Sequence, residues 1–262
     1  RTVEKRKEHR IMQNQCRDSF YTTFPTYPSM LDYHEVQARN SQWKHTQVRN
    51  LEVEPLDAKS PYFGNTAAFA GGISEEAVKD TAENLGLAIR IDGELYPVRS
   101  TAYKSLLDRA KIGGTALPKL DRGVLAQTLN ACLKLFGSDA LTLIRDEKVA
   151  AVHSGDAVDY SVLPIDALLR VLQSNLDARF PENEFEQGYS DHFISSATWK
   201  LPKQKEDLLG AYAKLLASQG KTKIADKLMP GIRFITSDTG VASAKVSALL
   251  LGFQCPIHIG GC

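Results

Sequence analysis

The stretch that decides the fold is residues 74–98, SEEAVKDTAENLGLAIRIDGELYPV. It begins with a helix signature, because Ser74 is a natural N-cap, the next two glutamates complement the positive end of the helix dipole, and Gly86 can end the helix in the left-handed conformation. Alternating apolar residues then flank Asp92-Gly93, the strongest short signal for a β-hairpin, since a type I′ turn needs positive φ at both central positions. The stretch therefore predicts a helix followed by an antiparallel hairpin.

The chain after residue 98 repeats this alternation of helices and hairpins. A second hairpin is indicated by ALTLIR and KVAAVH on either side of Asp146-Glu147. Hairpins make antiparallel neighbours, which favours an α+β fold over a doubly wound parallel sheet. We therefore expect a single α+β domain over residues 51–262, preceded by an N-terminal arm over residues 1–50. Three further helices are expected at residues 100–112, 121–136 and 202–218, and another begins at residue 164. A polar loop is expected at residues 181–191. Strands are expected at residues 192–201 and on both sides of residues 238–240.

The predicted arm mixes a basic start with a run rich in aromatic residues and proline, SFYTTFPTYPSMLDYHE. Its apolar positions form no clean stripe, which predicts at most a short helix followed by extended chain. Aromatic side chains bury much area at a small entropic cost, so we expect Tyr21, Phe24, Tyr27 and Tyr33 to anchor the arm on the body or on a neighbouring subunit. The arm is therefore also the candidate surface for homo-oligomer formation.

The composition is that of an ordinary globular protein, with 262 residues, 43% hydrophobic and 24% charged. These proportions argue against a disordered chain, a collagen-like repeat or a disulfide scaffold. The longest apolar run falls far short of the roughly 20 residues that cross a bilayer, so no membrane association is expected. Four irregularly spaced cysteines without a signal peptide favour a cytoplasmic setting.

Charge is distributed unevenly along the chain, with a net +4 over residues 1–50, −8 over 51–199 and +5 over 200–262. Basic residues near strands and loops are candidate contacts for the phosphates of nucleic acid, and single-strand binding adds aromatic faces for stacking. The candidate cations are Arg145, Lys148, Lys221, Lys223, Lys227 and Arg233. The candidate stacking residues are Tyr160, Phe193, Trp199 and Phe234, for which core packing is the alternative.

Two short motifs point to ligands but are incomplete. The sequence GKT at residues 220–222 lacks the earlier glycine and the preceding strand of a phosphate-binding loop. Cys255, His258 and Cys262 have the residue types and spacing of a partial zinc site. A fourth ligand would have to come from a distant part of the chain, and buried cysteines in a terminal strand are the simpler interpretation. No cofactor is therefore expected.

Four segments resemble, in this order, a family encoded by phages and plasmids that is called domain of unknown function 932. They are LPKLDRGVLAQTLNACL, ALTLIRDEKVAAVHS, LPIDALLRVL and GIRFITSDTGVASAKVSALL. The match is loose and covers about residues 74–254, and Thr236 departs from it because asparagine is expected there. The resemblance implies a role in DNA processing or anti-restriction and transfers no catalytic residue. The matching positions are Asn130, Arg145, Ser154, Tyr160 and residues 237–240.

These observations predict a nucleic-acid-associated protein of a phage or mobile element. It would bind single-stranded DNA during recombination or replication in a bacterial cytoplasm, and it is more consistent with a binding protein than with an enzyme. The alternative is a protein-interaction or anti-defence factor that binds a host protein through the arm and the acidic middle of the chain. A metal-dependent enzyme using Cys255, His258 and Cys262 is a third hypothesis.

Overall fold

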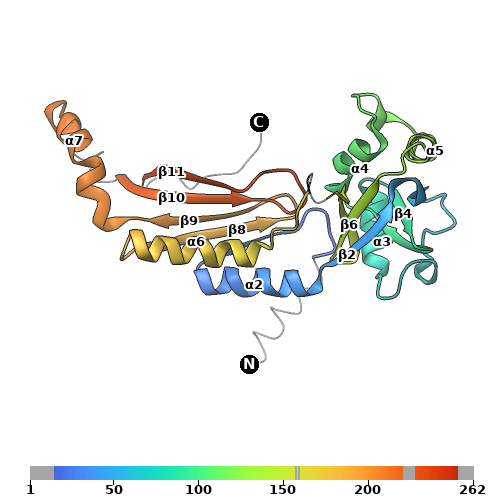
Figure 1. The fold of residues 1–262 in the computed structure, drawn as a ribbon, viewed down its shortest axis with the longest axis horizontal. Coiled ribbons are helices and arrows are strands. Elements are labelled where there is room, and N and C mark those ends of the chain that lie inside the picture. The colour runs from blue at the N-terminus through green and yellow to red at the C-terminus, as the bar shows by residue number, and fades with distance from the viewer. Residues whose placement is uncertain (1–14, 157, 159, 221–227, 253–262) are drawn as a thin grey trace.

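The computed structural model describes residues 15–156, 158, 160–220 and 228–252. The fold is α+β, as the sequence predicts (Figure 1). The helices of the described part are α2 (Tyr27–Asn40), α3 (Glu75–Glu83), α4 (Ala102–Ala110), α5 (Arg122–Leu133), α6 (Ile165–Arg179) and α7 (Lys205–Ser218), with short 3-10 helices at Val48–Asn50, Thr66–Ala68, Leu117–Lys119 and Pro202–Gln204. The strands are β1 (Tyr21–Phe24), β2 (Gln42–Gln47), β3 (Glu52–Pro55), β4 (Leu87–Ile91), β5 (Glu94–Pro97), β6 (Asp139–Arg145), β7 (Lys148–Ser154), β8 (Glu184–Asp191), β9 (Ser195–Lys200), β10 (Leu228–Thr236) and β11 (Lys245–Gly252).

The described strands form three antiparallel sheets. Sheet A has the order β1-β8-β9-β10-β11, sheet B the order β2-β6-β7, and sheet C the order β3-β4-β5. Sheet A makes up one half of an elongated molecule, and sheets B and C make up the other half (Figure 1). A parallel bridge between Val98 and Val149 joins sheet C to sheet B, and the Arg99 N–H continues it by donating to the Val149 carbonyl at 2.9 Å.

The helix and hairpin signals of residues 74–98 are confirmed. The Ser74 hydroxyl accepts a hydrogen bond from the Ala77 N–H at 3.2 Å and so caps α3. Gly86 has a φ of +68°, as its place after the helix requires. Asp92 and Gly93 have φ values of 53° and 85°, which is the type I′ geometry between β4 and β5.

The β6–β7 hairpin has a turn of the same hand without glycine. Asp146 and Glu147 have φ values of 47° and 68°, which is a costly conformation for residues with a side chain. Tertiary contacts hold the turn, since the Gln37 amide donates to the Asp146 carboxylate at 3.3 Å and the Ser74 N–H donates to the Glu147 carboxylate at 2.7 Å. The tip of this hairpin is therefore fixed by α2 and by the N-cap of α3.

The predicted boundary at residue 50 does not separate an arm from a domain. Strand β1 pairs with β8, and β2 pairs with β6, so residues 21–47 belong to sheets A and B. The short helix expected here is instead the 14-residue α2. Its buried side chains are Met30, His34 and Gln37, so the helical period is carried largely by polar residues and gives no apolar stripe.

The polar loop predicted at residues 181–191 is also wrong, because residues 184–191 form β8 in sheet A. This strand has few apolar residues because small side chains face the helix layer. A Cβ placed on Gly188 would lie 2.6 Å from Met30 Sδ and 3.1 Å from a ring carbon of Phe24. Glycine thus permits the close approach of α2 to the sheet, and it also removes the alternating pattern that marks a strand.

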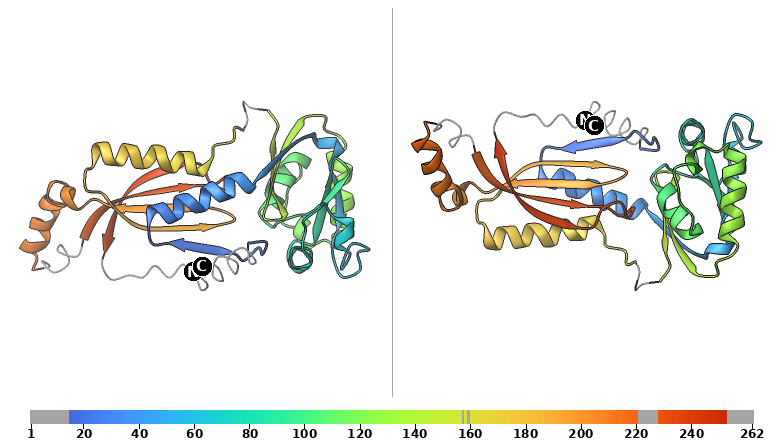
Figure 2. Two further views of the ribbon diagram at one scale, coloured as in Figure 1. Left: turned by 90° about the horizontal axis from the view of Figure 1, so that it is seen from below. Right: turned by 90° about the horizontal axis from the view of Figure 1, so that it is seen from above.

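Each half of the molecule has its own core. The larger core lies between sheets B and C and helices α4 and α5, and the smaller one lies between sheet A and helices α2 and α6. In the view from below, α2 and α6 lie in front of the strands of sheet A (Figure 2). In the described part of the chain, no helix covers the opposite face of sheet A between α7 and α4, and we call it the open face (Figure 2). Within the described residues, each helix is too short or too polar to span a bilayer.

Candidate functional site

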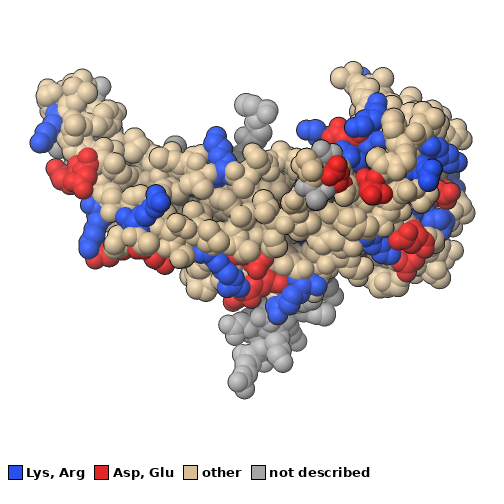
Figure 3. Space-filling model, viewed as in Figure 1, with Lys and Arg blue, Asp and Glu red and all other residues tan. Residues whose placement is uncertain are grey.

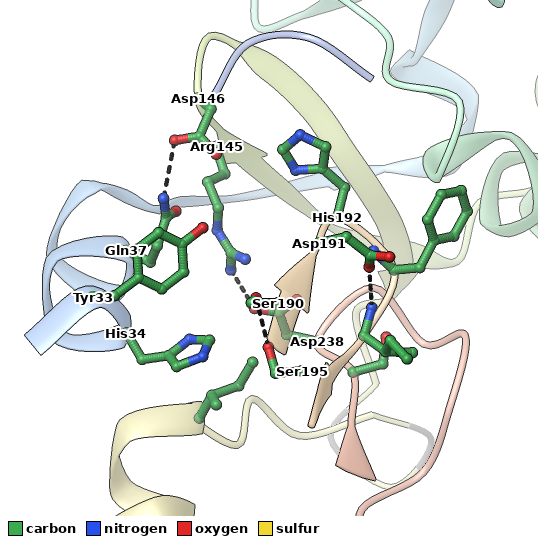
Figure 4. Close-up of a pocket in the computed structure, with 14 residues that line it drawn as sticks. Tyr33, His34, Gln37, Arg145, Asp146, Ser190, Asp191, His192, Ser195 and Asp238 are labelled. Carbon is green, nitrogen blue, oxygen red and sulfur yellow. Dashed lines mark hydrogen bonds and ion pairs between the residues drawn. The ribbon is translucent and has the colours of Figure 1, made fainter. Parts of the chain in front are cut away.

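The two halves of the molecule meet in a polar junction around the β10–β11 turn (Figure 4). Three segments converge there, namely α2, the β6–β7 turn and the strand ends of sheet A. Arg145 bridges them, because its guanidinium forms an ion pair with Asp238 and donates to the Ser41 hydroxyl at 2.8 Å. The side chains of Arg145 and Asp238 are each only 17% exposed. The polar lining of the junction comprises Tyr33, His34, Gln37, Arg145, Asp146, Ser190, Asp191, His192, Ser195, Ser237 and Asp238.

The junction is closed to ligands. The cavity at its centre has a volume of about 10 Å³, roughly the space that one water molecule needs. Ser190 and Ser195 form a hydrogen bond of 2.9 Å within it, and the Asp191 carboxylate accepts the N–H groups of Phe193 and Ile194 at 2.7 and 2.8 Å. These groups satisfy one another, whereas His34 Nε2 and Gln37 Oε1 are buried without a hydrogen-bond partner among the described residues. The contacts across the junction hold the two halves together, and the remaining space is about that of one water molecule.

A second buried charge cluster lies behind the β6–β7 hairpin. The Lys148 side chain is completely buried and forms ion pairs with Asp18, at 3.0 Å, and with Asp80. The Asp18 carboxylate also accepts the Ser100 N–H at 2.9 Å. Burial alone would raise the pKa of Asp18, but Lys148 and the hydrogen bond from Ser100 outweigh it and lower that pKa. Lys148 therefore joins β7 to the N-terminal segment and to α3.

Arg99 supports both clusters from within the core. Its side chain is buried, and its guanidinium donates to the carbonyl oxygens of Gln15, at 3.3 Å, and of Asp146, also at 3.3 Å. One of its bonds thus holds the strained β6–β7 turn and another holds the start of the described chain. Such a buried cation stabilises the fold only while its partners remain in place.

The histidines near the junction are neutral at physiological pH. Burial lowers the pKa of His34 to about 4 and that of His192 to about 2, and it also lowers the pKa of His153. The junction therefore gains little charge from His34 and His192 between about pH 5 and 8, where histidine switches normally operate.

Most of the positions on which the predicted resemblance depends meet at the β10–β11 turn. His153 Nε2 lies 2.9 Å from the Asp238 carbonyl oxygen, and the Tyr160 hydroxyl donates to the same oxygen at 3.1 Å. The His153 and Tyr160 rings stack with centroids 3.7 Å apart. Asn130 lies elsewhere and has a structural role, since its amide pairs with the N–H and carbonyl of Val53 at 2.7 and 2.8 Å.

An open cleft adjoins this turn on the side of α4, and we call it the α4 cleft. It consists of two cavities, of about 420 and 610 Å³, that share Arg109 and Ser154 in their linings. Volumes of this order are typical of small-molecule sites, in contrast to the closed junction. The first cavity is lined by Thr101, Lys104, Ser105, Asp108, Arg109, Val152, His153, Ser154, Tyr160 and Thr239 to Val241, and the second by Arg109, Lys111, Ser138, Asp139, Ser154, Gly155 and Asp156.

The cations of the α4 cleft have no carboxylate partner among the described residues. Lys104, Arg109 and Lys111 form no ion pair with any described residue. Arg145 and Lys148, which lie outside the cleft, each form ion pairs with aspartates. The Nε of Arg109 is buried and has no hydrogen-bond partner in the described part of the chain. Leaving such a donor unpaired is costly, so Arg109 is the group of the cleft with the most to gain from an anionic ligand.

The open face of sheet A leads toward this cleft. Side chains alternate along a strand, and Trp199 and Phe234 point into the core, so Thr198 and Arg233 point to the opposite face. On that face Thr198 is only 2% exposed, and Arg233 is half-buried beside it. Arg233 Nε donates to the Thr198 hydroxyl at 3.3 Å, and Arg233 has no ion pair within the described residues. The upper outline of the molecule dips between α7 and α4, and lysine and arginine side chains, with acidic ones among them, gather over α4 (Figure 3).

The structure separates the six cations predicted from the sequence. Lys148 and Arg145 are neutralised by buried or nearly buried carboxylates and are removed from any surface that faces phosphates. Arg233 lies on the open face. The remaining three, Lys221, Lys223 and Lys227, lie outside the described residues.

The four aromatic candidates divide in the same way. Trp199 and Phe234 are core residues, with exposed fractions of 0% and 4%. Phe193 is 43% exposed in the β8–β9 turn, and Tyr160 lines the α4 cleft. Sequence reasoning did not single out Lys104, Arg109 or Lys111. They lie on and just after an amphipathic helix, where exposed cations are ordinary, and they form no ion pair with the described residues although three aspartates line the same cavities.

Comparison of the chain with protein-family models, with curated proteins and with solved structures finds no match. The resemblance to the phage and plasmid family therefore stays a prediction. Among the residues that the structure describes, no three His, Cys, Asp or Glu side chains are grouped to hold a metal ion. The candidate zinc ligands Cys255, His258 and Cys262 lie outside those residues.

Proposed function

We propose that this protein binds single-stranded DNA across the open face of sheet A, with phosphates at the cations that border this face. The observation that carries the proposal is that the three cations lining the α4 cleft and Arg233 on sheet A form no ion pair with the described residues; the three are Lys104, Arg109 and Lys111. Cations that form no ion pair can supply the electrostatic part of nucleic-acid affinity, which depends on released counterions.

The dimensions of the face support a short single strand. Strand β10 has nine residues and is therefore ~30 Å long. A surface of this length suits a few nucleotides, within the range of about 4–16 that one single-strand-binding domain occupies. Arg233 lies three residues before the end of β10, so it is ~10 Å from the turn that lines the α4 cleft.

Aromatic side chains at the edge of the face can receive bases. Tyr21 on β1 and Tyr189 on β8 stack with ring centroids 6.2 Å apart, and Tyr21 is 65% exposed. Phe193 is exposed at the end of the sheet nearest the junction. Stacking on such rings is tolerant of sequence, and we therefore expect binding with little base specificity.

The biological setting in the proposal follows from the resemblance stated above. Recombination or replication of a phage or other mobile element in a bacterial cytoplasm would use a protein of this kind. No residue of the junction or the cleft requires a catalytic step, so the proposal is for a binding protein.

The test compares a charge-neutralised variant with a matched control of equal charge change. The triple variant Lys104→Gln, Arg109→Gln and Arg233→Gln should bind a fluorescently labelled thymidine oligonucleotide about 100-fold more weakly at 0.1 M salt, if each cation neutralises one phosphate. The control, Arg39→Gln, Lys59→Gln and Lys134→Gln, changes exposed cations away from the face and should bind nearly as wild type. Equal binding by the two triple variants would refute the proposal.

One observation favours a protein partner as a second candidate function. On α7, Leu208, Tyr212 and Leu215 follow at helical spacing and are 60%, 45% and 54% exposed. An exposed apolar stripe of this kind is typical of a contact surface for another helix. If α7 contacts another protein, replacing the three residues by serine should lower the molar mass of the complex measured by light scattering or release the bound partner. An unchanged mass without any partner would argue against it.

A further inference from the structure

The α4 cleft differs from the open face of sheet A because it is concave and polar on several sides. Its two cavities, of about 420 and 610 Å³, meet at Arg109 and Ser154. Cavities of roughly 300–1,000 Å³ hold ligands the size of a nucleotide. The cleft is thus large enough for one nucleotide unit and lies at the end of the face on which we place the strand.

Arg109 is the centre of the cleft. It lines both cavities, its Nε is buried without a hydrogen-bond partner in the described chain, and cations flank it on both sides. Lys104 belongs to the first cavity and Lys111 to the second. A planar guanidinium between two ammonium groups is suited to an anion with several oxygens, because it donates two parallel hydrogen bonds while the lysines add charge.

The cleft also contains acceptors. Asp108 lines the first cavity, and Asp139 and Asp156 line the second. The Asp156 carboxylate already accepts the Val158 N–H at 2.9 Å. A bare inorganic anion would be repelled by these carboxylates, whereas a nucleotide offers sugar hydroxyl and base amino groups as donors to them. The mixed lining therefore favours a nucleotide over a simple anion.

We infer that the α4 cleft binds the terminal nucleotide of a DNA strand and that Arg109 contacts its terminal phosphate. This inference rests on the proposed single-strand binding. A terminal phosphate monoester carries about 1.5 to 2 negative charges at neutral pH, against one on an internal phosphodiester. Arg109, with Lys104 in one adjoining cavity and Lys111 in the other, favours the higher charge, and a concave cleft accepts a strand end more readily than a continuous strand. The phosphate can belong to the 5′ or the 3′ end.

The experiment measures the affinity of the full chain for three oligonucleotides of one sequence, with a 5′-phosphate, with a 3′-phosphate and with no terminal phosphate. The wild type should bind one phosphorylated form about tenfold more tightly than the unphosphorylated one, as a charge-assisted hydrogen bond of modest strength would give. Arg109→Gln should abolish this preference. Arg233→Gln should weaken all three forms by the same factor and retain the preference.

The outcomes separate the inference from the function on which it rests. Equal affinity of the wild type for all three oligonucleotides would overturn the terminal-phosphate site and leave single-strand binding in place. No binding of any of them would overturn both. Should Arg109→Gln lower the unfolding midpoint, Lys104→Gln provides the second variant, because Lys104 is exposed and its removal should reduce the same preference.

Discussion

Replacing Lys148 by methionine should destabilise the protein by about 3–5 kcal/mol, the usual cost of removing one member of a buried ion pair. The Lys148 side chain is 0% exposed and holds the carboxylates of Asp18 and Asp80 together. Methionine fills a similar volume but carries no charge, so the substitution leaves two acceptors without their cation. The measurement is urea unfolding followed by circular dichroism, with the exposed Lys119→Met as control, which should change stability by less than about 0.5 kcal/mol.

Removing the carboxylates of Asp18 and Asp80 as well should restore much of the stability that Lys148→Met loses. In the triple variant with Asp18→Asn and Asp80→Asn no uncompensated charge is left, so we expect it to be more stable than Lys148→Met by about 2 kcal/mol or more. Because the pKa of Asp18 is lowered in the fold, its contribution is present above about pH 4 and is lost as the pH falls through the folded pKa. A loss below about 1 kcal/mol for Lys148→Met, as for an exposed pair, would refute this account of the cluster.

Three further outcomes follow from the described contacts. Asn130→Ala should destabilise the fold by about 2 kcal/mol, because it leaves the N–H and carbonyl of Val53 unpaired, and Asn130→Asp should also destabilise it, because a carboxylate oxygen would then face the Val53 carbonyl oxygen. Gly188→Ala should destabilise by about 1–3 kcal/mol through overpacking against α2, whereas Gly71→Ala meets no atom within 4 Å and should be nearly neutral in the same unfolding assay. His34, whose pKa is lowered to about 4 by burial, should keep constant NMR shifts between about pH 5 and 8, and its neutral form makes stability fall as the pH drops below about 6.5. A His34 titration near pH 6.5 would show that it is not buried as described.

The parts of the fold that could be predicted from the sequence are those that local chemistry decides. The Ser74 cap, the Asp92-Gly93 turn and the hairpin around residues 146–147 each need only neighbouring residues, and all were located correctly. Helix α2 and strand β8 were missed because their buried faces consist of polar or small side chains. Their positions are decided by the sheet and helix that pack on them, which no local period records.

The candidate site could be predicted only in part, for a related reason. Lys148 looks like any other lysine in a hairpin, but its partners Asp18 and Asp80 lie 130 and 68 residues away in the sequence. Ion pairing over such distances cannot be read from the chain, and it turned two predicted phosphate contacts into structural cations. The same limitation concealed Arg109, which lines both cavities and whose Nε is buried without a hydrogen-bond partner in the described chain.

The most direct test of the central claim is the salt dependence of oligonucleotide binding. With four phosphate contacts, at Lys104, Arg109, Lys111 and Arg233, the logarithm of the wild-type association constant should fall with the logarithm of salt concentration with a slope of about −3. The triple variant Lys104→Gln, Arg109→Gln and Arg233→Gln should retain a slope of about −1. Identical slopes for the two proteins, or a wild type that does not bind at low salt, would contradict the claim that these cations form the interface.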